Sequence, residues 1–181
     1  PNKGRDIGPL ITCLGKELEE KYDIYGHIHT KKSVHIAKHQ SHSWRTFLIE
    51  NLIGNKENHM MDFIISAMIK DKTIGLVFPS DPHCPSWDAN YRKARIMADK
   101  LNIQSLVHEF NFPIGTMFWA RKGALKPLYD MDLQWIDYPS EPISDDGTVL
   151  HAIERLIPLV AENQGYKYGL TYVPACSRVL E

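Results

Sequence analysis

The residues best suited to chemistry follow one short apolar stretch of the chain. The pattern of residues 22–28 predicts a buried strand. The polar side chains at its carboxyl end are His27, His29, Lys31 and Lys32. Side chains in that position commonly present functional groups to a ligand in α/β proteins. Because lysine binds phosphate as a compact positive charge, we expect a phosphate or diphosphate site here.

The distribution of charge favours the same class of ligand. Between Asp23 and Glu50 the chain has no acidic residue, but it has four lysine or arginine residues and five of the nine histidines. There are two alternatives to a phosphate site. The lysines could belong to a solvated basic loop and bind only water, and one of the histidines could be a structural residue held by hydrogen bonds. The pair His27 and His29 could also ligate a metal, although no carboxylate lies near it in the sequence.

A second group of candidates precedes the strongest predicted helix, residues 148–162. An acidic loop, residues 131–147, leads into it, and Asp145, Asp146 or Thr148 could cap its first turn. The positive end of a helix dipole lowers the pKa of a carboxyl group at that position. A carboxylate kept ionised in this way suits a general base better than a general acid.

Composition indicates one ordinary globular domain spanning residues 1–181. The chain is 43% hydrophobic and 24% charged, with a formal net charge of −1, so it gives no sign of a nucleic-acid partner. Its three cysteines are widely spaced, which fits a reducing cytoplasm better than a disulfide scaffold. No apolar run approaches the ~20 residues of a membrane span. Because Pro1 stands where Met is usual, we expect a piece of a longer chain.

Apolar runs that alternate with amphipathic segments predict an α/β fold with a mostly parallel sheet flanked by helices. The predicted strands are residues 22–28, 73–79, 110–120 and 166–173. The predicted helices are residues 7–22, 41–52, 57–70, 89–101, 122–130 and 148–162.

Four motifs in this order resemble the rhamnan synthesis protein F family, over about residues 4–165. They are residues 4–9 (GRDIGP), 27–33 (HIHTKKS), 115–119 (GTMFW) and 146–155 (DGTVLHAIER). The family comprises glycosyltransferases that build rhamnose-containing bacterial surface polysaccharides, such as lipopolysaccharide O-antigen and cell-wall polymers. The resemblance therefore implies a hexosyltransferase that uses a nucleotide sugar.

The resemblance also implies a GT-A-like, Rossmann-like fold that lacks its first strands. The turn of residues 2–4 is similar to the NxG turn of GT-A enzymes, and Pro1 would then lie inside a sheet. In such enzymes the next strand ends in an Asp-x-Asp motif that holds Mg²⁺ or Mn²⁺. Here His29, Thr30 and Lys31 fill that place, which suggests that lysines neutralise the diphosphate instead of a metal.

Individual roles follow from the resemblance. It implies donor contacts for Arg5 and Asp6, which otherwise form a turn and a helix cap. An aromatic ring such as that of Trp119 could stack on a sugar, although a core role is the alternative. Asp146 would be the catalytic base, with Asp145 in reserve. His151, five residues further on, would contact the substrate.

The expected function is transfer of a sugar, rhamnose by resemblance, from a nucleotide sugar with inversion. The donor would be dTDP-rhamnose, and the acceptor a lipid-linked saccharide. The expected location is the cytoplasm, at the inner face of the membrane through peripheral association. One alternative is a non-catalytic nucleotide- or carbohydrate-binding domain of a larger synthase. Another is a histidine metallohydrolase.

Overall fold

The structure is a computed structural model that describes residues 3–30, 38–81 and 86–173, without the side chains of residues 38–42. Lys31 and Lys32, the predicted phosphate ligands, lie outside the described residues, and so does Pro1. In the described part of the chain, no helix is both long enough and apolar enough to cross a membrane.

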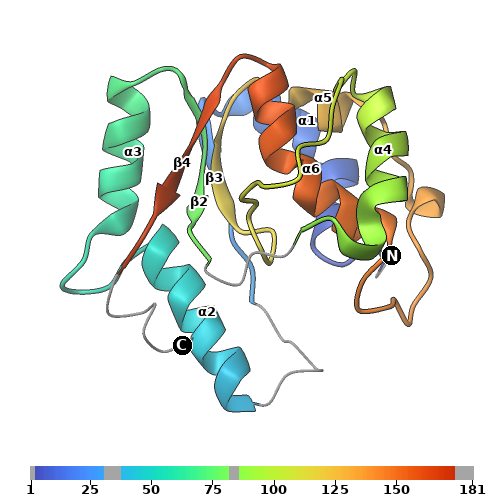
Figure 1. The fold of residues 1–181 in the computed structure, drawn as a ribbon. Helices are drawn as coiled ribbons and strands as arrows, with labels where there is room; N and C mark the ends of the chain where they lie inside the picture. The colour runs from blue at the N-terminus through green and yellow to red at the C-terminus, as the bar shows by residue number, and fades with distance from the viewer. Residues whose placement is uncertain (1–2, 31–37, 82–85, 174–181) are drawn as a thin grey trace.

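Four strands form one sheet, and its class agrees with the α/β prediction. The order is β1 (Ile24–His27), β3 (Phe118–Arg121), β2 (Ile74–Pro79) and β4 (Lys167–Thr171). Strand β3 runs antiparallel to both of its neighbours, whereas β2 and β4 are parallel (Figure 1). The prediction of a mostly parallel sheet is therefore wrong. The sheet is mixed, and its order does not by itself define a GT-A fold.

The segment between β2 and β3 explains the difference. A parallel neighbour requires the chain to cross once, back to the end of the sheet where the first strand began. Here helix α4 (Tyr91–Lys100) and the irregular residues 101–117 follow β2, and they bring the chain back to the end of the sheet where β2 finishes, so β3 is antiparallel to β2. Strand β3 then starts at Phe118 rather than at residue 110, because Gly115 and Thr116 form a turn with positive φ angles.

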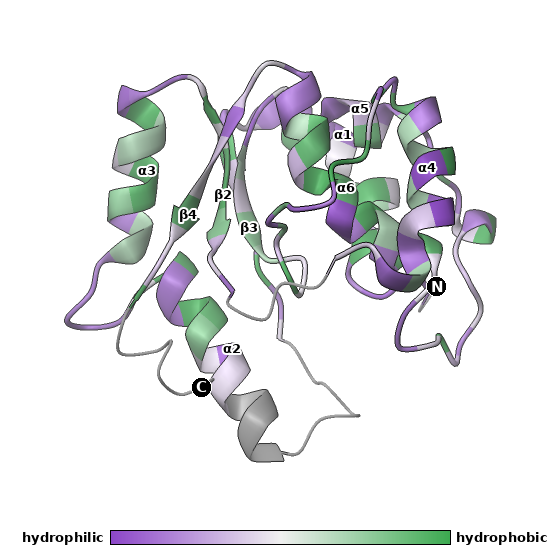
Figure 2. Cartoon of the chain, in the orientation of Figure 1, coloured by the Kyte–Doolittle hydropathy of each residue, from purple (hydrophilic) through white to green (hydrophobic). Residues whose placement is uncertain are grey.

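Helices cover both faces of the sheet. Helices α2 (Lys38–Leu52) and α3 (Met60–Lys70) cover one face, and α1 (Gly15–Lys21), α4, α5 (Lys126–Asp130) and α6 (Val149–Asn163) lie on the other (Figure 1). Helix α3 is largely apolar and α4 largely hydrophilic in the view of Figure 2.

Alternation along β3 separates the cores on the two faces. Phe118 and Ala120 belong to the larger core, which includes α6, whereas Met117 and Trp119 pack toward α2 and α3. The division follows from the geometry of a strand, in which residues two apart share a face.

Helix α6 is the central helix of the larger core and matches the predicted helix 148–162. Ten of its fifteen residues are buried, among them Ile153, Leu156 and Val160. Burying one such aliphatic side chain stabilises the fold by about 2 kcal/mol. The helix is roughly 22 Å long at 1.5 Å per residue, so its two ends face different parts of the molecule.

The remaining predicted elements agree with the structure to within a few residues, with one difference in type. The predicted helix 7–22 consists of a π-helical segment, η1 (Pro9–Leu14), followed by α1. Short 3-10 turns, η2 (Asp88–Asn90) and η3 (Trp135–Asp137), lie in the segments before α4 and α6.

Candidate functional site

The candidate site lies where β1 ends and β3 begins, beside the first turns of α6. In the antiparallel pair, His27 is opposite Phe118. The residues that follow His27 therefore lie beside the residues that precede Phe118. This brings two of the motifs found in the sequence, around His29 and around Gly115, into contact.

Both histidines are held by the backbone of the turn before β3. His27 Nδ1 lies 2.6 Å from the carbonyl oxygen of Thr116, and His29 Nε2 lies 2.8 Å from that of Gly115. The two rings are neighbours, with centroids 5.6 Å apart, and His27 also packs against Phe118. Hydrogen bonding to the backbone was the structural alternative for one histidine, and both make such bonds.

Asp6 joins the histidines from the amino-terminal turn. Its Oδ2 lies 3.5 Å from His29 Nε2 and is buried without a hydrogen bond. Burial lowers the pKa of His27, and the carbonyl of Thr116 and the charge of Asp6 oppose that shift only in part. His27 is therefore neutral at neutral pH.

Glu154, on the second turn of α6, holds the turn before β3. Its Oε1 accepts a hydrogen bond from the backbone N–H of Gly115 at 2.7 Å. The hydroxyl of Thr116 lies 3.4 Å from the same oxygen. The carboxylate side chain is 13% exposed, so these bonds are largely shielded from water. Helix α6 is thereby connected to the histidines through the turn.

Arg155 is a buried cation at the centre of the site, with its side chain 6% exposed. Its guanidinium donates to the carbonyl oxygens of Ser86 at 3.0 Å and His151 at 3.1 Å. It also lies 5.0 Å from the centre of the Phe112 ring. One of its nitrogens is 3.5 Å from Asp146 Oδ1, which gives the buried cation a carboxylate partner.

Asp146 is not the cap of α6. The cap residue is Thr148, whose backbone N–H and hydroxyl both contact His151 Nδ1. Asp146 instead accepts a hydrogen bond from Asn90 Nδ2 at 2.6 Å, and Asn90 Oδ1 accepts from the N–H of Gly147 at 3.1 Å. Two segments 56 residues apart thus meet at this carboxylate.

The surroundings of Asp146 keep it ionised. Burial raises the pKa of its carboxyl group, but several groups together lower it below the ordinary value. These are the hydrogen bonds from Asn90 and Gly147 and the positive charge of Arg155. The carboxylate side chain is 37% exposed, so it remains accessible to a ligand.

His151 and Arg5 complete the site. Burial lowers the pKa of His151, and the charge of Asp146 raises it less. Its Nδ1 accepts the backbone N–H of Thr148 at 3.4 Å, so the neutral ring carries its proton on Nε2. Arg5 donates to the carbonyl of Ile143 at 3.0 Å, and its charge also acts on His151, as does that of Asp145.

Six of the predicted site residues therefore lie in one continuous group. They are Arg5, Asp6, His27, His29, Asp146 and His151, with Asp145 beside them. Trp119 lies apart, because its ring faces α2 and α3 and its Nε1–H donates to the carbonyl of Leu52 at 2.9 Å. Its predicted sugar contact stays a prediction.

Metal binding has no geometric support in the described part of the chain. No three or more histidine, cysteine, aspartate or glutamate side chains are grouped there so as to hold a metal ion. Asp6 is the carboxylate that the sequence did not place near His29, but these side chains do not form such a group.

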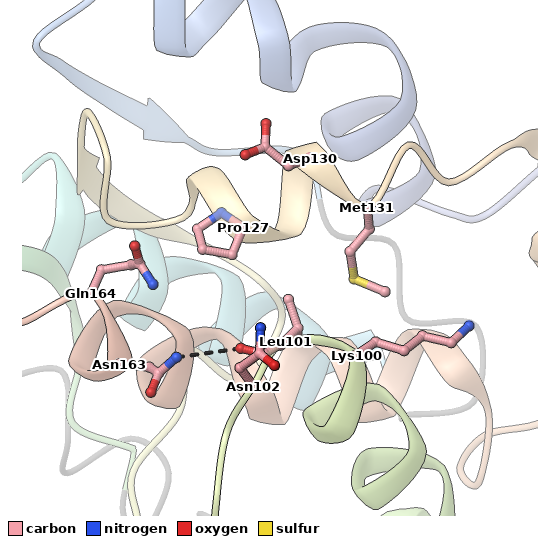
Figure 3. A pocket seen from close by; sticks show the side chains of 8 residues that line it. All are labelled: Lys100, Leu101, Asn102, Pro127, Asp130, Met131, Asn163 and Gln164. Carbon is pink, nitrogen blue, oxygen red and sulfur yellow. Dashed lines mark hydrogen bonds between the residues drawn. The ribbon is translucent and has the colours of Figure 1, made fainter.

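A cavity of about 300 Å³ lies at the other end of α6, between the ends of α4, α5 and α6 (Figure 3). Its lining residues are Lys100, Leu101, Asn102, Pro127, Asp130, Met131, Asn163 and Gln164. The side chain of Asn163 donates to the carbonyl of Leu101 across part of it. Since α6 is roughly 22 Å long, this cavity is remote from the candidate site.

Three members of the site were absent from the predicted set. Asn90, Glu154 and Arg155 were not proposed as site residues from the sequence. Helical spacing places Arg155 four residues after His151, which is a signal that they share a face. No local signal identifies Asn90, because its partner Asp146 is distant in the sequence.

The fold and the site define an α/β protein with a charged, partly buried polar network at one edge of its sheet. The chain belongs to the rhamnan synthesis protein F family, whose sequence profile matches residues 1–166. The family is named for the synthesis of rhamnan, a polysaccharide. The family resemblance expected from the four motifs is thereby confirmed.

Two curated relatives are similar over nearly the whole chain. Both are named uncharacterized protein WxcX, from Xanthomonas campestris pv. campestris strains B100 and ATCC 33913. Each is 34% identical over an alignment of 189 residues that covers 96% of this chain and 26% of the relative. The chain thus spans about a quarter of their length. No solved structure matches it.

Proposed function

We propose that the chain is the glycosyltransferase domain, or part of one, that transfers rhamnose from dTDP-rhamnose to a growing surface polysaccharide. The acceptor is a lipid-linked saccharide, reached at the inner face of the membrane. The reaction inverts the sugar carbon in one displacement. Family membership supports the polysaccharide role, and the site supports the chemistry.

The observation that carries the chemistry is the state of Asp146. Its carboxylate is ionised, partly exposed and free of the capping role that Thr148 fulfils. Inversion in a single displacement needs such a carboxylate to take the proton of the acceptor hydroxyl. The hydrogen bonds from Asn90 and Gly147, together with the charge of Arg155, lower the pKa of the Asp146 carboxyl group and keep it in the basic form.

The donor is bound by Arg5, His27 and His29, together with Lys31 and Lys32, which lie outside the described residues. Arg5 and the two lysines would supply positive charge for the diphosphate, and the histidines would contact the sugar nucleotide. Positive side chains stabilise the charge that develops on a departing nucleoside diphosphate. The proposal needs no metal ion at the Asp-x-Asp position.

The test is Asp146→Asn in a transfer assay with dTDP-rhamnose and a synthetic lipid-linked acceptor. Asparagine keeps an oxygen that can accept from Asn90 but cannot take a proton. Transfer should fall by about 10²–10⁴, the usual contribution of a general base, while the melting temperature and donor affinity stay close to the wild type. Asp132→Asn, which alters an exposed ion pair with Lys16, is the matched control. Transfer retained within a few fold would exclude Asp146 as the base.

A second candidate function has one observation in its favour. The chain spans about a quarter of the length of its curated relatives, so catalysis could reside elsewhere in a larger protein. The chain would then be a nucleotide- or carbohydrate-binding module. In that case the wild-type chain binds dTDP-rhamnose but transfers nothing, and Asp146→Asn leaves donor binding unchanged.

A further inference from the structure

The turn before β3 has an unusual backbone. Gly115 and Thr116 both have positive φ angles, 84° and 57°. Glycine adopts such angles freely, but a β-branched residue does so only when its surroundings hold it there. Residues kept in such conformations cluster at functional sites.

Glu154 is the group that holds this turn from outside. A single carboxylate oxygen receives the N–H of Gly115 and the hydroxyl of Thr116. Within the turn, the N–H of Thr116 also bonds to the carbonyl of Pro113 at 2.7 Å. Glu154 therefore connects helix α6 to residues 38 and 39 positions earlier in the chain.

The carbonyls of the same two residues determine where the protons of the histidines lie. A carbonyl oxygen only accepts hydrogen bonds, so the ring nitrogen that faces it must carry a proton. His27 is therefore protonated on Nδ1, and His29 on Nε2. In the neutral rings, the lone pairs lie on Nε2 of His27 and on Nδ1 of His29. Adjacent histidines thus have opposite tautomers.

We propose that Glu154 is a positioning residue that fixes these tautomers through the turn, so that the two histidines accept hydrogen bonds from hydroxyl groups of the sugar. This inference rests on the proposed function and specifies it. A ring nitrogen with a lone pair suits a hydroxyl donor, whereas a phosphate oxygen needs an N–H group. The diphosphate is then bound by the positively charged side chains and not by the histidines.

The first experiment measures the tautomers in the ligand-free chain by long-range ¹H–¹⁵N NMR of labelled histidine. The pH is kept above the ordinary histidine pKa of about 6.5. The His27→Gln and His29→Gln variants assign the signals. The wild type should show His27 protonated on Nδ1 and His29 on Nε2. A wild-type His27 protonated on Nε2 overturns the proposal, whatever the variants do.

Variants of Glu154 then test its role. Glu154→Ala should convert both histidines to mixtures of tautomers, whereas Glu154→Gln keeps an acceptor oxygen and should preserve the wild-type pattern. Glu162→Ala, on the last turn of the same helix, is the control and should change nothing. A folded Glu154→Ala with unchanged tautomers overturns the proposal. If Glu154→Ala does not fold, the proposal is overturned when Glu154→Gln fails to show the wild-type tautomers of His27 and His29.

The ligand class is tested by titration with methyl rhamnoside and, separately, with inorganic pyrophosphate. The rhamnoside should shift the ¹⁵N resonance of His27 Nε2, and pyrophosphate should not. A response to pyrophosphate at that nitrogen, or none to the rhamnoside, overturns the hydroxyl assignment. The tautomer measurements need neither transfer nor donor, so they can fail while the transferase proposal stands, and the reverse also holds.

Discussion

Two carboxylates near opposite ends of β3 show how differently this fold treats similar groups. Glu19 lies where β3 ends and accepts the N–H of Gly123 at 2.7 Å, with the hydroxyl of Tyr25 at 3.4 Å. Asp146 belongs to the network where β3 begins and accepts from Asn90. Each is bound by neutral donors, but Glu19 is buried at 8% exposure, whereas the side chain of Asp146 is 37% exposed and has the buried Arg155 beside it.

The difference appears in their pKa values. Burial raises the pKa of Glu19, because Gly123 and Tyr25 offset it only in part and the nearby lysines contribute little. For Asp146, the hydrogen bonds and the charge of Arg155 exceed the effect of burial, so its pKa is lowered. Glu19 thus has the properties of a structural group, whereas Asp146 is kept ready to take a proton.

After Asp146→Asn, the variant expected to change the environment of Asp146 most is one that removes the positive charge of Arg155. Arg155→Met leaves Asp146 without its charge partner and Ser86 without a hydrogen-bond donor. Breaking a buried pair typically costs 3–5 kcal/mol, and Asp146 is partly exposed, so we expect a loss of about 3 kcal/mol. The pKa of Asp146 should also rise.

Urea denaturation and NMR titration of labelled aspartate measure the two effects. Lys16→Met, which removes the cation of an exposed pair with Asp132, serves as control and should leave stability unchanged. A variant of Arg155 as stable as this control would show that the ion pair does not stabilise the site.

A smaller effect is expected for Asn90→Ala. Asn90 is fully buried and bridges Asp146 to the N–H of Gly147, so its removal takes a hydrogen-bond donor from Asp146 and the side-chain acceptor from Gly147. The expected loss in free energy of unfolding is about 2 kcal/mol, within the range for an unsatisfied buried polar group. Calorimetry measures it, with Asn163→Ala at the exposed end of α6 as control. A loss no greater than that of the control contradicts the bridging role.

The smallest expected effect is the change in folding stability with pH. It is also the most specific, because Glu19 and Asp146 should contribute to it with opposite signs. The pKa of Glu19 is raised above 4.5 in the folded state, so its contribution to stability is present at low pH and lost as the pH rises through the folded value. The pKa of Asp146 is lowered below 3.8, so its contribution is present at higher pH and lost as the pH falls.

The wild type should therefore lose stability relative to Glu19→Gln as the pH rises above 4.5. It should lose stability relative to Asp146→Asn as the pH falls below 3.8. Chemical denaturation of the three proteins at a series of pH values measures both slopes. If the stability of the wild type relative to each variant changed with pH in the same direction, the two carboxylates would not differ as proposed.

Much of the fold was predictable, and so was part of the site. The spacing of apolar residues identified α6 and β2. A helix or strand that buries apolar side chains shows this in the spacing of residues close together in the sequence. The residue types at His27, His29 and Asp146 indicated chemistry before their contacts were known. The direction of β3 was not predictable, because it depends on how residues 101–117 return across the sheet.

Sequence alone therefore determined which segments are helices and strands, which faces they bury, and which side chains carry charge or a titratable ring. Tertiary structure decided which of those side chains meet. The antiparallel pairing of β1 and β3 puts His29 beside Gly115, and the start of α6 brings Glu154 to that turn. The physical reason is range. Periodicity acts over a few residues, whereas the contacts of this site join residues that are up to 138 positions apart.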